Sequence, residues 1–163
     1  GANTVSGSVG WWAIDQVTTA ANAATAVDGY SLGISTTMGA ITVGAGYKEV
    51  STAGESIRGA LGTSTSISGT AQSKDEEAVN VGAQWAQGKS AISVNYFKNE
   101  MEMAAATDGS DSVTKWTLGY KYTMGPGIDF LGSVQNINWN DEGDQAPNNN
   151  KGTAIVGGVA VAF

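Results

Sequence analysis

Apolar and polar residues alternate with a period of two in eight segments of the chain, and this pattern restricts the fold more than any other feature. The alternation is clearest from Val113 to Met124, where large apolar residues at even positions are separated by Lys, Thr and Gly. Successive side chains of a β-strand point to opposite faces, so a period of two predicts strands rather than helices. The predicted strands are Asn3–Ile14, Asp28–Met38, Ala40–Val50, Ala78–Gln87, Ser90–Met101, Val113–Met124, Ile128–Trp139 and Gly152–Phe163.

The connections between these strands alternate between short and long. Short turns fall at Gly39, Gly88-Lys89 and Gly125–Gly127, and long connections begin at Asp15, Ser51, Glu102 and Asn140. Because consecutive strands joined by short turns run antiparallel, the short turns share one end of the sheet and the long connections share the other. This asymmetry is typical of membrane β-barrels. A soluble β-sandwich also alternates apolar and polar residues, but it gives no reason to separate connections by length.

Composition excludes several classes of function. The 163 residues contain no Cys and no His, which removes disulfides, thiolate chemistry and the usual general base, so we do not expect an enzyme. The net charge of -7 disfavours a nucleic-acid partner, because phosphate binding needs a basic face. No apolar run is long enough for a transmembrane helix, whereas a transmembrane β-strand needs only about 9 to 11 residues. The length suits one domain, residues 1–163, and the start without Met predicts a processed or partial chain.

Acidic and aromatic residues are distributed unevenly along the predicted strands. Of the 15 acidic residues, only Asp129 lies at the end with the short turns. Aromatic residues lie near the short turns at Trp85, Tyr122, Phe130 and Phe163, and nearer the long connections at Trp11, Tyr30, Tyr47, Tyr96, Trp116 and Trp139. Two such girdles fit rings that rest at the two water–lipid interfaces of a membrane.

The C-terminal part of the sequence resembles a known family. The segment Tyr122–Phe130 (YTMGPGIDF), one further strand, an Asn/Asp-rich loop and a Gly/Val/Ala strand ending on Phe163 are similar to the end of proteobacterial general porins. The resemblance is specific over Val113–Phe163 and is one of pattern upstream. It implies an antiparallel β-barrel of about 16 strands in the outer membrane of a Gram-negative bacterium. It also implies a homotrimer whose water-filled lumen passes small hydrophilic solutes.

The chain departs from the family pattern in supplying eight strands. Two interpretations follow: the C-terminal half of a 16-stranded porin, or a closed eight-stranded barrel whose interior is just wide enough for side chains to fill. The inward-folded loop that narrows such pores belongs to the half of the fold that is not seen, so no residue is assigned to it.

Six polar residues are candidates for the pore lining: Lys48, Asn80, Gln84, Asn95, Lys115 and Lys121. They share the polar side of their predicted strands. As lumen residues, the lysines set a local field that passing anions feel, as charged rings do in channels. The alternative is that Lys48 and Lys115 lie at strand ends in the rim and select nothing.

The densest acidic set is Asp141, Glu142 and Asp144, whose oxygens could hold Ca²⁺ or Mg²⁺. Their spacing matches no calcium-loop motif, and a solvated turn is the simpler interpretation. The acidic rim as a whole could attract divalent ions that bridge it to anionic lipid such as lipopolysaccharide. No other cofactor is expected.

The sequence therefore predicts an outer-membrane porin that lets small hydrophilic solutes and ions diffuse passively. One alternative is a plugged eight-stranded barrel with a structural or surface-binding role. Another is a secreted, self-assembling β-rich surface protein, which the Ser/Thr/Ala/Gly-rich loops suggest.

Overall fold

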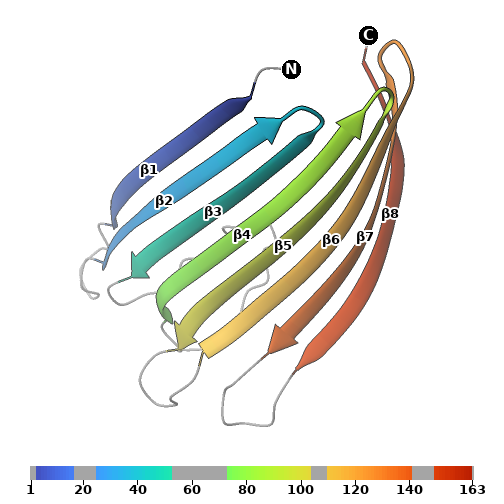
Figure 1. Ribbon diagram of the computed structural model, residues 1–163. Helices are drawn as coiled ribbons and strands as arrows, with labels where there is room; N and C mark the ends of the chain where they lie inside the picture. The colour runs from blue at the N-terminus through green and yellow to red at the C-terminus, as the bar shows by residue number, and fades with distance from the viewer. Residues whose placement is uncertain (1–2, 17–24, 53–72, 104–109, 141–148, 163) are drawn as a thin grey trace.

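A computed structural model describes residues 3–16, 25–52, 73–103, 110–140 and 149–162. These residues form one antiparallel sheet in which each strand pairs with its neighbours in sequence (Figure 1). The strands are β1 (Thr4–Gln16), β2 (Thr25–Met38), β3 (Ile41–Thr52), β4 (Ser73–Gln87), β5 (Ser90–Met103), β6 (Ser110–Gly125), β7 (Ile128–Asn140) and β8 (Asn150–Val161). The predicted all-β architecture of eight antiparallel strands is confirmed.

Three tight turns join β2 to β3, β4 to β5 and β6 to β7. Each contains a glycine with a positive φ, of 61° at Gly39, 60° at Gly88 and 70° at Gly127. Residues with a Cβ adopt this conformation at a steric cost, and it gives a two-residue hairpin the twist that its strands need. The turns lie at one end of the sheet together with both chain termini (Figure 1). We call this the hairpin end and the opposite one the long-connection end.

The strands run further toward the long-connection end than the sequence predicts. Glu76 and Glu77, expected in a loop, belong to β4, where Glu77 pairs with Glu49 of β3 and with Glu100 of β5. Backbone hydrogen bonds of a β-ladder do not require apolar side chains, so a ladder continues where the alternation of side chains has ended. For this reason the alternation marks the apolar part of each strand and not its full length.

The strand β7 differs from its prediction. In its sequence, Phe130 and Val134 fall on one face and Leu131, Ile137 and Trp139 on the other, and this pattern predicts a β-bulge that would bring them together. Instead, β7 pairs with both neighbours without a register shift from Asp129 to Trp139. The expected bulge is therefore wrong, and Leu131, Ile137 and Trp139 lie on the polar face of the sheet. Register shifts occur in β4, between Ser73 and Glu76, and in β6, between Thr123 and Gly125.

The apolar face of the sheet is open to its surroundings. Val9 is 80% exposed, Leu118 56% and Ile155 81%, and Val50 is the single buried hydrophobic side chain within the described ranges. A β-sandwich buries one face of each sheet against the other. The described chain therefore has no sandwich core, and an apolar face of this size needs an apolar environment.

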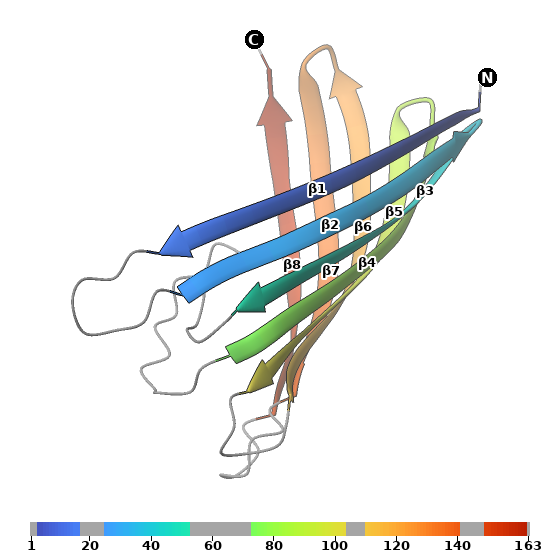
Figure 2. The same cartoon turned by 90° about the vertical axis from the view of Figure 1, so that its left-hand side faces the viewer.

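The polar face lies on the inner side of a curved sheet. On β3, the exposed residues Ile41, Val43 and Ala45 alternate with the half-buried residues Thr42, Gly44 and Gly46. Side chains on a concave face crowd together, so the half-buried set marks the inside of the curve. Figure 2 shows the sheet bending strongly between β1 and β8.

The sheet is not closed, because β1 and β8 each have one neighbour and do not contact each other. The described strands therefore do not form the closed eight-stranded barrel that was one of the two interpretations. No helix long and apolar enough to cross a membrane occurs in the described ranges.

Candidate pore-lining face

All six predicted pore-lining residues lie on the polar face. Lys48 is on β3, Asn80 and Gln84 on β4, Asn95 on β5, and Lys115 and Lys121 on β6. The register relates them directly: Asn80 pairs with Phe97, which in turn pairs with Lys115. Because no register shift intervenes between these pairs, the side chains emerge on the same side of adjacent strands.

Lys48 is part of a charged network near the long-connection end. Its Nζ atom lies 3.6 Å from a carboxylate oxygen of Glu76. The Glu76 carboxylate also accepts a hydrogen bond of 2.7 Å from the Asn99 side chain. The Lys48 ammonium further lies 5.9 Å from the centroid of a Trp12 ring. The charge of Lys48 is thus neutralised by a carboxylate on the neighbouring strand.

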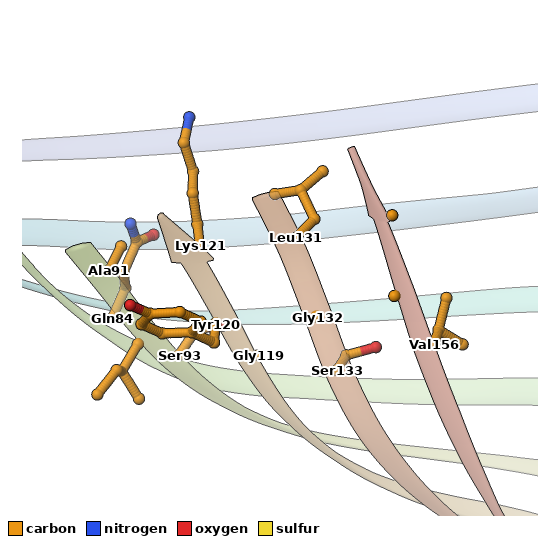
Figure 3. A pocket seen from close by; sticks show the side chains of 13 residues that line it. Gln84, Ala91, Ser93, Gly119, Tyr120, Lys121, Leu131, Gly132, Ser133 and Val156 are labelled. Atoms are coloured by element: carbon orange, nitrogen blue, oxygen red, sulfur yellow. The ribbon is translucent and has the colours of Figure 1, made fainter. Parts of the chain in front are cut away.

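Lys121 is paired in the same way near the hairpin end. Its Nζ atom lies 2.7 Å from a carboxylate oxygen of Asp129 on β7, and Thr123 donates a second hydrogen bond of 2.7 Å to that carboxylate. Lys121 borders a hollow of about 450 Å³ that Gln84 also lines. Figure 3 shows Lys121 and Leu131 extending to the same side, with the Tyr120 ring turned away from them.

Lys115 has a different environment. Among the described residues it has no ion pair, and its Nζ atom lies 5.8 Å from the centroid of the Phe97 ring. Phe97 and Ile137 are its direct neighbours across the strands on either side. Lys115 is half-buried, as are residues 110–114 at the end of the same strand.

Asn80 and Asn95 are held against each other. Asn80 donates to the Asn95 side-chain oxygen at 3.2 Å, and Asn95 donates to that of Asn80 at 3.0 Å. A reciprocal amide pair of this kind is polar and uncharged. The pair joins β4 to β5 and therefore lies between Lys48 on β3 and the two lysines on β6.

Aromatic side chains on the apolar face form two bands. Trp11, Tyr30, Tyr47, Tyr96 and Trp116 lie toward the long-connection end, and Trp85, Tyr122 and Phe130 lie toward the hairpin end. Two contacts join the first band, with ring centroids 5.8 Å apart for Tyr30–Tyr47 and 4.8 Å apart for Tyr96–Trp116. Trp139, predicted as a girdle residue, lies on the polar face opposite Val113. Phe163 lies outside the described residues.

The sequence analysis missed a cluster on the apolar face. The Glu49 carboxylate accepts hydrogen bonds from the Tyr30 hydroxyl and, at 2.8 Å, from the Tyr47 hydroxyl. Glu49 is two residues from Tyr47, and that spacing alone places both on one face. The row continues through Glu77 to Glu100, which pairs with Lys98. These charges mark where the apolar face ends.

The described ranges contain no group of three or more His, Cys, Asp or Glu side chains that could hold a metal ion. The weak candidates Asp141, Glu142 and Asp144 lie outside those ranges.

An antiparallel curved sheet with an exposed apolar outer face, a polar inner face and connections sorted by length defines the class of membrane β-barrel proteins. The family model described as Gram-negative porin matches residues 1–142, a range that includes β1 to β7. The chain belongs to the Gram-negative porin family, and this membership implies the outer membrane as its location. Comparisons with curated proteins and with solved structures give no match.

Proposed function

We propose that this chain builds part of the wall of a water-filled pore through which small hydrophilic solutes and ions diffuse passively. The proposal rests on one observation: the single layer of strands has an apolar face on one side and a polar face on the other. A single sheet with lipid on one side and water on the other needs no packed core, and only Val50 is a buried hydrophobic residue in the described part.

The open edges of the sheet support a wider barrel. The strands β1 and β8 each leave one row of backbone N–H and C=O groups without a strand partner. Such groups must be hydrogen-bonded within a bilayer, because each costs several kcal/mol when left unpaired there. The barrel is therefore completed by further strands. We propose a total of about 16, which leaves an aqueous channel where eight would not.

Two partners belong to the same proposal. The resemblance to general porins supports a homotrimer. The carboxylates of Glu49, Glu77 and Glu100 lie in one row beside the aromatic band on the outer face. Divalent ions that bridge this row to the phosphates of lipopolysaccharide would offset the repulsion between the acidic groups.

Planar bilayer recording of the purified protein tests the pore. We expect stepwise increases in conductance as single channels insert, with currents that grow in proportion to salt concentration. Protein that folds and inserts, as judged by its β-sheet circular dichroism in lipid vesicles, but gives no conductance contradicts the proposed pore. That result would favour a plugged barrel with a structural or surface-binding role.

A further inference from the structure

On the polar face, Lys115 lies among large apolar side chains. Phe97 and Ile137 lie directly across from Lys115 on the two neighbouring strands. Two residues further along, Val113 pairs with Trp139, which is 55% exposed. We call these five residues the Lys115 cluster. Apolar groups on this side of the sheet do not serve the lipid contact, which the other face provides.

The two other lysines of this face differ from Lys115 in their partners. Lys48 is paired with Glu76, and Lys121 is paired with Asp129. The carboxylate of Asp111 shares the face and strand of Lys115, but it lies four residues away, a separation of about 13 Å along the strand. No ion pair joins Lys115 to a carboxylate of the described residues, and its ammonium lies 5.8 Å from the centroid of the Phe97 ring.

We infer that the Lys115 cluster is a binding site, within the pore, for small organic anions that carry an aromatic or apolar body, such as aromatic carboxylates. This inference rests on the proposed pore function and names a class of solute for it. The anion's carboxylate pairs with the Lys115 ammonium, and its ring lies against Phe97, Ile137 and Trp139.

The composition of the cluster selects this class over simpler anions. Chloride and acetate gain the charge of Lys115 but cover none of the apolar surface around it. A phenyl ring that removes about 60 Å² of apolar surface from water gains roughly tenfold in affinity. A neutral aromatic molecule covers the same surface but does not pair with the ammonium. Charge and ring together are what the site recognises.

The test measures block of the chloride current of the full protein in planar bilayers. Sodium benzoate and sodium acetate are added separately, and the concentration that halves the current is determined for each. For the unchanged protein we expect benzoate to act at a concentration about tenfold lower than acetate. Benzyl alcohol, which carries the ring without the charge, should block less than benzoate.

Variants then locate the effect. Trp139→Ser should bring the acetate-to-benzoate ratio to within about twofold of one, because it removes apolar surface that the ring covers. Lys115→Gln should remove the preference for benzoate over benzyl alcohol, whereas Lys115→Arg should keep it. Lys121→Gln is the matched control on the same face and strand. It changes the general field for both anions, so their ratio should stay near tenfold.

The outcomes separate the inference from the pore itself. An unchanged protein that conducts but responds equally to benzoate and acetate overturns the inference and leaves the pore standing. A tenfold ratio that survives in Trp139→Ser, or a preference for benzoate over benzyl alcohol that survives in Lys115→Gln, also overturns it, because the anion then binds elsewhere. A complete absence of current contradicts the proposed function instead. If one variant yields no channels, the ratio in the unchanged protein and in the other variant still decides.

Discussion

The two faces of this sheet differ in which residues they tolerate. On the outer face of β6, every second residue from Trp116 to Met124 is apolar, and the same face continues with Thr114 and Ser112 toward the long-connection end. The inner face mixes Lys115 and Lys121 with Phe97, Ile137 and Trp139 on adjacent strands. The difference teaches that the membrane constrains one face alone. A charge facing the bilayer midplane costs a few kcal/mol, whereas an apolar side chain facing water merely forgoes its burial.

The largest expected loss of stability, and the clearest test of the difference between the two faces, comes from placing a charge at the centre of the outer face. Leu118 is flanked by Val94 and Val134, so Leu118→Arg should destabilise the membrane-inserted fold by about 2 to 4 kcal/mol. Thr117→Arg is the matched control on the inner face and should cost less than about 1 kcal/mol. Urea unfolding from lipid vesicles measures both, and equal losses would break the distinction between the faces.

A second contrast concerns crowding. A Cβ at Gly29, on the inner face, would overlap the Trp12 ring and lie 2.6 Å from the carbonyl oxygen of Glu49. Gly29→Ala should therefore destabilise by about 1 to 3 kcal/mol. At Gly7, on the outer face, the nearest atom to an added Cβ is 3.8 Å away, so Gly7→Ala should be neutral within about 0.5 kcal/mol. The same unfolding assay compares them, and a larger loss at Gly7 would contradict the inner position of the crowded face.

A third, smaller effect tests the polar border of the outer face. Tyr47→Phe removes a hydrogen bond of 2.8 Å to the Glu49 carboxylate and should cost about 1 kcal/mol. Tyr120→Phe is the control, because its hydroxyl makes no hydrogen bond to any described residue and its loss should be close to neutral. Equal stability of the two variants in vesicle-based unfolding would show that the hydrogen bond from Tyr47 to Glu49 contributes nothing.

The smallest effect on stability is expected on the inner face. Asp129→Asn breaks the ion pair with Lys121, whose side chain is 48% exposed, and should change stability by less than about 1 kcal/mol. The freed lysine should instead raise the preference for chloride over potassium, measured as the reversal potential across a KCl gradient. An unchanged reversal potential would mean that this pair does not face the conducting lumen.

The sequence predicted the outer face well because lipid contact enforces a strict period of two. All eight strands, their order and the tight turns follow from that period and from the glycines at Gly39, Gly88 and Gly127. The polar side of the same period also placed the six candidate wall residues on one face.

The period-two alternation could not predict features of the parts of the sheet that do not contact lipid. The alternation in β7 was ambiguous because Leu131, Ile137 and Trp139 face the inner side, where apolar residues carry little cost. The beginning of β4, with Glu76 and Glu77, was missed for the opposite reason, since hydrogen-bonded ladders persist beyond the apolar band. The ion pairs of Lys48 and Lys121 depend on cross-strand neighbours that only the register supplies, and so does the absence of an ion pair between Lys115 and any described residue.

Thiol accessibility along β6 tests most directly whether lipid contacts one face and water the other. The chain has no cysteine, so single substitutions at residues 116 to 122 each introduce a unique probe. In protein reconstituted into lipid vesicles, a membrane-impermeant thiol reagent added to both sides should label residues 117, 119 and 121 quickly and residues 116, 118, 120 and 122 slowly. Labelling at uniform rates, or faster labelling of the even positions, would contradict the assignment of the two faces.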